Sequence, residues 1–511
     1  MSLPRRWRRL TALGLAAVIP AGCSTPPTVK PSGAVSVLPP GLPAAKAAAP
    51  TPPTVVPASN SEPTSPPAPA QPDGPVLATE VIDLGTALGL AGVGNPTIGL
   101  AREAVREAQA RELAARSLLL PSLSAGTSLN VHRGVLQRST GQLLAVDRQS
   151  LYLGGGAQAV GGGTVGVPGV RLFAHLGDAA LAPLAARQRV MARLSDEQAV
   201  QNAVLLDVAV RYLQLVGADA RVEVLRRAEG ELAEVVRLTA EYARAGQGRR
   251  ADANRADANA ATFRRRTQQA EEEAAVAAAR LGELLNLDPA VQLRPPPGAV
   301  PLLRLVDEST PLDALIAQAL AGRPELSARS AAVAEAQTRV RQEKVRPWLP
   351  VVSAGFSAGG FGGGSNLGGI DFSPLRGRTD FDVSAVWAGR NLGFSNRALA
   401  RRAEAVVGQA VAELDRTTNT VRAEVATAKA DAETAGRRME IAARQLAIAE
   451  EGFALGLARI KQGEGRPLEV LDGFRQLADS RLEAVRATVE FDAAQFGLWV
   501  ALGLAPAVPL V

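Results

Sequence analysis

Residues 463–472 read Gly463-Glu464-Gly465-Arg466-Pro467-Leu468-Glu469-Val470-Leu471-Asp472 and follow a very long alanine-rich stretch with helical periodicity. A second copy of the pattern, Gly246-Gln247-Gly248-Arg249-Arg250-Ala251-Asp252, ends another such stretch upstream. Both copies place Gly-x-Gly after the helical pattern and an acidic residue six positions beyond the first glycine. Glycine adopts positive φ without a Cβ penalty, which suits a chain that leaves a helix and reverses. The two stretches therefore predict the turns of two long helical hairpins.

The hairpins belong to a duplicated chain. Leu120-Pro121 recurs as Leu349-Pro350, 229 residues later, whereas Gly246 recurs as Gly463, 217 residues later. The offset changes between about residues 126 and 176, so the two copies differ in length there. That region is rich in Gly and Gln without a helical period, as an exposed loop would be. We expect two structural repeats, 80–300 and 301–511.

The sequence pattern predicts the same order of helices and strands in both repeats. An opening helix ends at Leu-Pro, because proline disfavours continuation, and a strand pair, a long helix, the Gly-x-Gly turn and a returning helix follow. The predicted helices are 97–119, 184–245 and 250–286, a short connecting helix near 312–320, and then 325–347, 396–461 and 467–503. A returning and an opening helix together match one long helix in length, so the two should stack end to end beside it.

The predicted strands alternate between apolar and polar residues. The clearest ones are 122–131, 352–357 and the return strand 380–388, and a weaker return strand is expected near 163–173. Period-two alternation indicates strands with one buried face. About four strands cannot close a barrel, and an apolar face with open edges would aggregate in water. Several copies of the chain should therefore share one closed barrel.

Aromatic residues favour a membrane setting for the strands, because barrels carry aromatic girdles beside their apolar band. Seven lie in the second strand region: Trp348, Phe356, Phe361, Phe372, Phe381, Trp387 and Phe394. The alternative is packing in the core of a sheet. The helices are too polar to span a bilayer, so they should project as a tube on one side of the barrel.

The N-terminus has the form of a secretory signal. Residues 1–22 combine an arginine-rich start, an apolar run and small residues before Cys23, the single cysteine of the chain. This arrangement resembles a bacterial lipoprotein processing site and predicts lipidation of Cys23; the alternative is an unmodified cysteine beside an ordinary signal. Residues 23–79 are rich in Pro and Ala, and we expect a disordered tether there.

Composition and motifs exclude several classes of function. The formal charge of +6 includes four arginines of the signal segment, and no basic patch with interleaved aromatics indicates nucleic-acid binding. One cysteine and two histidines make a protein-built metal site improbable. Gly161-x-Gly163-x-x-Gly166 lacks the strand, helix and acidic residue of a dinucleotide site, and His132 lies on the polar face of a strand. We expect no catalytic residues, no cofactor and no enzyme activity.

From about residue 80 to 505 the sequence resembles the TolC family, the outer-membrane factors of tripartite efflux and type I secretion systems. The resemblance lies in the duplicated order of elements and in the hairpin turns, where Gly463 precedes Glu469-Val470-Leu471-Asp472 at the family's spacing and Gly246 precedes Asp252. It implies a mainly α fold: a homotrimer with a long α-helical barrel, a 12-stranded β-barrel, and a closed tip that opens when an adaptor docks. The apolar residues usual after the tip glycine are replaced here by Gln247-Gly248 and Glu464-Gly465.

The resemblance also implies site residues. Glu469 and Asp472, with Asp252 at the equivalent position of the first hairpin, match the acidic ring that narrows the periplasmic entrance. The alternative is a solvated helix face beside a turn. The glycines of the turns are the candidate adaptor-docking tips: Gly246, Gly248, Gly463 and Gly465.

The leading functional prediction is a passive, lipid-anchored outer-membrane channel that exports what an inner-membrane pump delivers through a periplasmic adaptor (membrane fusion protein). Its partners would be two further copies of itself, the adaptor, the pump indirectly and outer-membrane lipid. Two alternatives remain open, the adaptor itself and a structural coiled-coil lipoprotein without a pore. An adaptor should show one hairpin, and a pore-less lipoprotein would leave the alternating strands without a role.

Overall fold

A computed structural model of the chain describes six stretches: 78–155, 169–246, 248–298, 300–369, 372–462 and 466–506. All of them belong to one compact unit, Asp73–Val511. The predicted signal peptide (1–22), Cys23 and nearly all of the predicted tether (23–79) lie outside the described residues.

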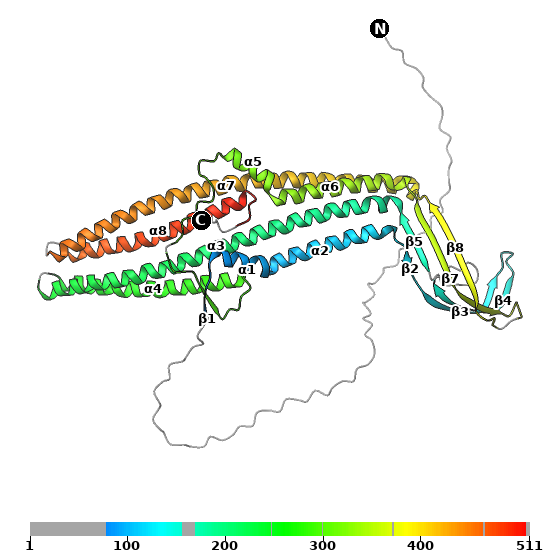
Figure 1. The fold of residues 1–511 in the computed structure, drawn as a ribbon, viewed down its shortest axis with the longest axis horizontal. Helices are drawn as coiled ribbons and strands as arrows, with labels where there is room; N and C mark the ends of the chain where they lie inside the picture. The colour runs from blue at the N-terminus through cyan, green and yellow to red at the C-terminus, as the bar shows by residue number, and fades with distance from the viewer. Residues whose placement is uncertain are drawn as a thin grey trace, which may run out of the picture. The chain divides into compact units, whose positions relative to one another are not determined.

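Two helices of nearly equal length run through the unit. α3 (Leu176–Arg244) has 69 residues and α7 (Phe394–Lys461) has 68. Each is accompanied by two shorter helices that follow one another along it (Figure 1): α2 (Pro96–Arg116) and α4 (Arg250–Leu284) along α3, and α6 (Pro324–Val345) and α8 (Pro467–Ala501) along α7. The predicted helices and their end-to-end stacking are confirmed.

The first long helix begins eight residues before its predicted start. Proline lacks an N–H and its ring clashes with the carbonyl four residues earlier, so it usually ends or kinks a helix. Instead Pro183 lies inside α3. The helix begins at Leu176, where His175 Nδ1 accepts a hydrogen bond from the Gly177 N–H at 3.1 Å. Pro183 cannot donate its intrahelical backbone hydrogen bond, and the packing of α3 against α2 and α6 stabilises the helix despite this loss.

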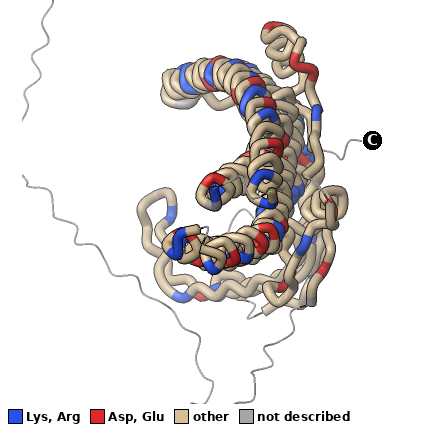
Figure 2. Tube along the Cα trace, turned by 90° about the vertical axis from the view of Figure 1, so that its left-hand side faces the viewer, with Lys and Arg blue, Asp and Glu red and all other residues tan. Residues whose placement is uncertain are grey.

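The helices form a layer that is four helices wide. It contains α2, α3, α6 and α7 near the strands, and α4, α3, α8 and α7 near the hairpin turns. In both parts α3 lies in the middle, and α7 lies at one edge. Seen along the helices, the layer follows an arc that is open on one side (Figure 2). Charged residues of both signs are interleaved along it.

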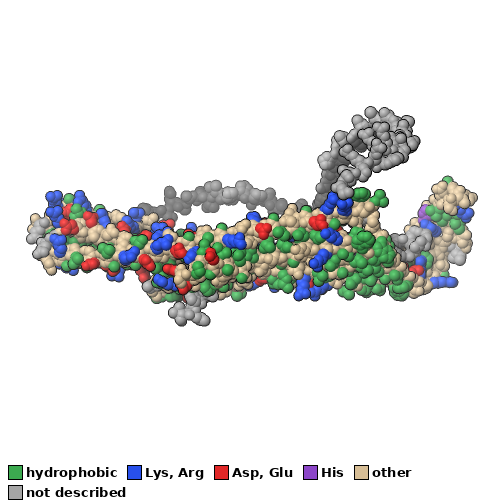
Figure 3. Space-filling model, turned by 90° about the horizontal axis from the view of Figure 1, so that it is seen from above, with side chains coloured by type: hydrophobic (Ala, Val, Ile, Leu, Met, Phe, Trp, Pro, Cys, Tyr) green, Lys and Arg blue, Asp and Glu red, His purple; other side chains and the backbone are tan. Residues whose placement is uncertain are grey.

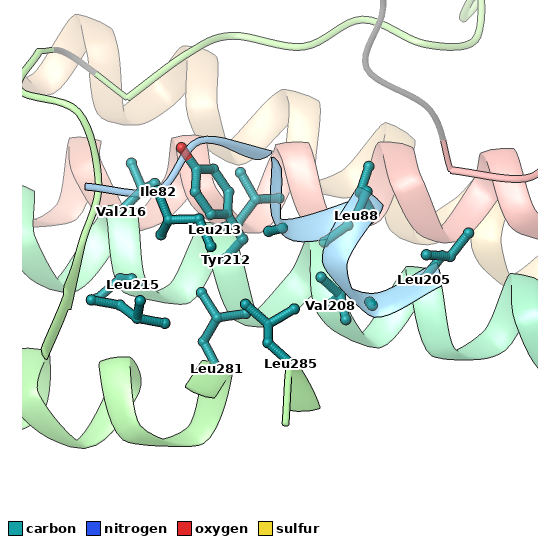
Figure 4. Packing of buried hydrophobic residues seen from close by; sticks show 14 of the residues in the cluster. Ile82, Leu88, Leu205, Val208, Tyr212, Leu213, Leu215, Val216, Leu281 and Leu285 are labelled. Atoms are coloured by element: carbon teal, nitrogen blue, oxygen red, sulfur yellow. The ribbon is translucent and has the colours of Figure 1, made fainter. Parts of the chain in front are cut away.

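A large hydrophobic cluster lies halfway along α3. There α1 (Leu84–Gly94) and two short parallel strands, β1 (Ala78–Val81) and β6 (Val291–Arg294), pack beside α3 and α4 (Figure 4). Leu213 and Leu281 are fully buried in it. Burying one such leucine contributes ~1.5–3 kcal/mol, so this cluster fixes where the N-terminal elements attach.

Residues 300–310, which we call the belt, join the two halves and are held on α8 by two buried polar side chains. Asp492 Oδ1 accepts the Leu303 N–H at 2.8 Å. Gln495 Oε1 accepts the N–H groups of Leu305 and Val306 at 3.1 and 3.2 Å. These three backbone donors of the belt are therefore satisfied by α8 rather than by water.

Asp492 is fully buried, and its Oδ2 has no hydrogen-bond partner within the described part of the chain. Burial raises the pKa of Asp492 to about 7, against the opposing effect of the hydrogen bond from Leu303. After the belt comes α5 (Leu312–Gly322), which confirms the short connecting helix predicted near 312–320.

The other six strands form a second sheet, at the end of the helices opposite the hairpin turns (Figure 1). Its members are β2 (Ser122–Leu123), β3 (Gly126–Gln137), β4 (Leu143–Gly155), β5 (Val170–His175), β7 (Val351–Ser365) and β8 (Arg376–Val386). Both β4 and β5 pair with β7, at different heights, while β3 pairs with β4 and β2 with β5. The six strands therefore occupy four lanes: β2/β3, β4/β5, β7 and β8.

The return strand of the first repeat differs from its prediction. It was expected near 163–173, with a loop before it, but the chain returns earlier as β4 and then continues as β5. Gly155 pairs with Ala358 and Val170 with Phe356, so β4 and β5 meet β7 on either side of Ser357. Residues 156–168 lie outside the described residues.

Candidate functional site

The register of the sheet gives it one apolar and one polar face, because directly paired residues point to the same side. Leu129 pairs with Leu151, and Phe356 pairs with Val170 and Phe381. The alternate positions along these strands point to the opposite, polar face and include Ser, Asn, Arg and Asp residues. The apolar face is exposed in the single chain; Phe381, for instance, is 74% accessible. The predicted assignment of residues to two faces is confirmed.

Large apolar side chains also gather where the strands meet the helices (Figure 3). Trp348 and Trp387 are 80% and 62% exposed there, and Trp387 Nε1 donates a hydrogen bond to the Trp348 carbonyl at 3.3 Å. Of the seven aromatics expected to form a girdle, Phe361 lies on the polar face, where Arg378 stands over its ring at 5.5 Å. The exposed ring of Phe394 lies at the start of α7.

The junction between strands and helices is held by ion pairs. Asp178, in the first turn of α3, accepts hydrogen bonds from Gln342 at 2.7 Å and Arg346 at 2.6 Å. Burial opposes ionisation of Asp178, but these two hydrogen bonds outweigh it and hold its pKa below the usual value. The start of α3 and the end of α6 are thereby tied together beneath the sheet.

The first hairpin turn follows the glycine chemistry that the sequence predicts. α3 ends at Arg244, and Gly246 has φ of +73°, the left-handed region that a side chain disfavours. A Cβ at Gly248 would lie 3.3 Å from the backbone of Tyr242 and Ala243, so this glycine allows the chain to pass close to the helix end. α4 then begins at Arg250.

The second turn lies between Lys461, the last residue of α7, and Pro467, the first of α8. Proline suits the first helical position, where its missing N–H would have no partner in the helix. Gly463 and Gly465 lie outside the described residues. Their role as docking tips stays a prediction, as does that of Gly246 and Gly248.

The three predicted gate residues have different surroundings. Glu469 and Asp472 are exposed on α8, and Asp472 pairs with Arg475 of its own helix, at 3.5 Å. Asp252 is 20% exposed, although it occupies the position equivalent to Glu469. It lies on the same face of α4 as the buried Ala256, which packs toward α3. The two copies of the turn have therefore diverged, and Glu469 and Asp472 are the more accessible acids.

Glu469 and Asp472 continue into a longer acidic face of α8. Asp479 lies seven residues after Asp472 and Glu483 four residues after Asp479, which keeps all four acids on one side of the helix. Asp479 and Glu483 line a groove of about 1010 Å³ between α3, α4 and α8. Asp492 holds the belt from the other side of α8. The predicted gate acids and the groove therefore share the face that the belt leaves free.

Near the turns the two hairpins are locked together by contacts that the sequence did not predict. Arg475 donates two hydrogen bonds to Asn259 Oδ1, from Nε at 2.8 Å and from Nη2 at 2.5 Å. Tyr242 Oη donates to the Ile460 carbonyl at 2.7 Å. Phe474 is fully buried and meets Phe263 of the first hairpin edge to face at 5.2 Å.

No group of three or more His, Cys, Asp or Glu side chains among the described residues could hold a metal ion. In the same part of the chain no helix is both long and apolar enough to cross a membrane.

Comparisons with known proteins agree with this architecture. Residues 315–504 match the family model described as outer membrane efflux protein. No curated protein matches this sequence. The fold is similar to that of the outer-membrane channel OprN, with 21% identity, 82% of this chain and 89% of that chain covered, and a TM-score of 0.66.

Two further solved structures are similar. One is a membrane protein from Pseudomonas aeruginosa, with 20% identity, 86% and 99% of the two chains covered, and a TM-score of 0.67. The other is the open state of the Neisseria gonorrhoeae MtrE outer membrane channel, with 20% identity, 83% and 89% covered, and a TM-score of 0.60. The resemblance to the TolC family is thereby confirmed, in sequence over residues 315–504 and in fold over most of the chain.

Proposed function

We propose that this chain, with the sequence of an outer membrane efflux protein in its second half and the fold of outer-membrane channels, forms a passive export channel in the outer membrane. The observation that carries the proposal is the sheet, which has an exposed apolar face, a polar face and two open edges. A sheet can span lipid only as a closed barrel, so this sheet needs further strands from other copies.

Three copies supply twelve lanes, which is the homotrimeric barrel that the sequence predicts. In one chain the free edge of β8 lies at one side of the sheet and that of β2/β3 at the other. Pairing β8 with β2/β3 of the next copy closes the sheet without leaving an edge. The apolar face then meets lipid and the polar face lines the lumen.

The edges of the helix layer support the same assembly. α7 lies at one edge and exposes Ile441, Ile448 and Leu455 at seven-residue spacing. Heptad spacing is the signature of a helix that packs on another helix. α4, at the other edge, exposes small residues, among them Ala258 and Ala261. Large side chains on one edge and small ones on the other suit head-to-tail packing of successive copies.

The rest of the proposal concerns anchorage and partners. Cleavage after residue 22 and lipidation of Cys23 would tether the chain to the outer membrane, with 23–79 as the linker. The hairpin turns, farthest from the sheet, would meet a periplasmic adaptor that connects the channel to an inner-membrane pump. Cysteine cross-linking from Gly246, Gly248, Gly463 and Gly465 to a co-expressed adaptor tests this; cross-links found only from the strand end would refute it.

Glu469 and Asp472 are proposed as the acids that narrow the entrance. Threefold repetition would bring six carboxylates together, and their field favours cations. Glu469→Gln with Asp472→Asn should raise the conductance or reduce cation preference in planar bilayers. Asp252→Asn is the matched comparison, because Asp252 is turned toward α3. An unchanged double variant rules out the gate assignment.

The alternative functions make different predictions. A periplasmic adaptor or a pore-less coiled-coil lipoprotein gives no conductance, whereas this chain has two hairpins and a sheet with a membrane-type face. The deciding experiment is bilayer conductance of the purified full-length protein together with its native mass in detergent. Pores with a trimer mass support the proposal. A monomer without conductance overturns it.

A further inference from the structure

We propose that the polar face of the sheet carries a basic band, Arg148, Arg376 and Arg378, which makes the barrel selective for anionic solutes. This inference rests on the proposed function, because it takes the polar face as the lumen. The solutes favoured at the end of the barrel away from the helices would be those that bear carboxylate or phosphate groups.

The register places the three arginines on one face, in three rows of the same half of the sheet. Arg378 pairs with Gly359 and Arg376 with Phe361, two residues farther along β7. Arg148 pairs with Ser365 on β7 and with His132 on β3. The rows run from residue 359 to 365 of β7, a rise of about 20 Å along the strand. All three lie in the half of the sheet away from the helices.

Within the described strands, acidic residues do not balance this band. Arg378 pairs with Asp380 at 2.8 Å. Neither Arg148 nor Arg376 has a carboxylate within 4.0 Å among the described residues. Asp382, the other acid on this face, lies opposite Gly355 in the row of Arg171, closer to the helices.

Two nitrogen atoms at the far end of the band lack a partner. Arg148 Nε and His132 Nε2 are shielded from solvent and have no hydrogen-bond partner within the part of the chain that the structure describes. The two residues are direct cross-strand partners on the polar face. The Arg148 Nε–H can only donate, and buried donors are normally satisfied, so this row is suited to an oxygen-bearing anion.

The charge is large enough to act across a lumen. Three arginines against Asp380 give each chain a net charge of plus two in the band, and three copies give plus six. The Debye length is about 10 Å at 0.1 M salt and 30 Å at 0.01 M, so the field fills the lumen at low salt. Arginine adds a planar fork that matches carboxylate and phosphate groups. The basic band and the acidic gate therefore act in opposite directions at opposite ends of the channel.

The test is the reversal potential of the full-length protein in planar bilayers between 10 and 100 mM KCl. The measurements use the Glu469→Gln, Asp472→Asn background, which removes the opposing field of the gate. We expect chloride to permeate more readily than potassium, and this preference to disappear at 1 M KCl. Replacing Arg148, Arg376 and Arg378 by Gln should lower the chloride-to-potassium permeability ratio at least threefold.

Matched variants separate charge from structure. Replacing the same three arginines by Lys keeps the charge and should keep the preference for chloride. Arg133→Gln with Asp147→Asn neutralises a pair on the apolar face, 3.4 Å apart, and should change nothing. If the triple Gln variant does not assemble, the exposed Arg376→Gln alone is expected to give about a third of the change in reversal potential.

The outcomes distinguish the two proposals. Conducting pores with equal selectivity before and after the Gln replacements overturn the basic band and leave the channel intact. Complete absence of conductance by the unmodified protein overturns the proposed function and this inference with it. The inference is also overturned if the triple Lys variant lowers the chloride-to-potassium permeability ratio as much as the triple Gln variant does. The loss of positive charge would then not be the cause of the change.

Discussion

Asp492→Asn is expected to remove a pH dependence from the attachment of the belt to α8. Burial raises the pKa of Asp492 from about 3.8 to about 7. A carboxyl group with a raised pKa stabilises the folded form fully below its unfolded pKa, and this contribution is lost as the pH rises toward the folded pKa. The belt should therefore be held most firmly near pH 4 and least firmly above pH 7.

The size of the effect follows from the two pKa values. A difference of about three units corresponds to about 4 kcal/mol, an upper limit on the change in the free energy of opening. Between pH 4.5 and 7.5 the same relation gives an opening equilibrium that increases about 200-fold. Asparagine keeps the oxygen that accepts the Leu303 N–H but cannot ionise, so this increase should vanish in the variant.

Hydrogen exchange of the peptide that contains Leu303, Leu305 and Val306 measures the opening directly. The variant at the same pH corrects for the intrinsic pH dependence of exchange. Asp479→Asn is the control, because Asp479 lies on the same helix but is 58% exposed and pairs with Arg266 at 2.9 Å. The reasoning is refuted if the wild type and Asp492→Asn lose protection in parallel between pH 4.5 and 7.5.

Three further predictions concern the turns, the hairpin contact and the sheet. Gly246→Ala should destabilise the first turn by ~1–2 kcal/mol, because the φ of Gly246 is left-handed. Gly230→Ala, inside α3, should instead stabilise the helix by ~1 kcal/mol. Limited proteolysis should therefore cleave the turn faster in Gly246→Ala than in Gly230→Ala. Phe474→Ala should lower the free energy of unfolding by ~3–5 kcal/mol, measured in urea, since the ring is fully buried between the hairpins. Phe381→Arg on the apolar face should cost ~2–4 kcal/mol in a membrane and reduce the amount of outer-membrane oligomer. Ser384→Arg, on the polar face of the same strand, should leave the amount of outer-membrane oligomer unchanged. An equal loss of oligomer in both variants would contradict the assignment of the two faces.

The loop that the sequence predicted before β5 shows how pairing overrides local pattern. Residues 143–155 mix Leu and Val with Asp, Arg, Gln and Ser, and they end in glycines, so their alternation is weak. They form β4 because β3 pairs along one side and β7 along the other. A strand between two partners satisfies its backbone hydrogen bonds even where its own propensity is low.

The hairpin contact could not be predicted for a related reason. Arg475 and Asn259 are 216 residues apart in the chain, and neither belongs to a recognisable motif. Their hydrogen bonds depend on the rotation of α8 against α4, which only packing of the full layer sets. The same packing turns Asp252 toward α3 while it leaves Glu469 exposed, although the two occupy equivalent positions.

The sequence by itself determined the repeated order of elements, the two reversals and the two faces of the strands. These features depend on residues close together in the chain: Gly246 at a left-handed position, Pro467 at a helix start, and alternating side chains in β8. Tertiary structure alone decided which lanes adjoin, which hairpin contacts hold the turns together, and that Arg148, Arg376 and Arg378 lie on one face in the same half of the sheet. The physical reason is that register and helix rotation are set by contacts between distant segments, which a local pattern does not encode.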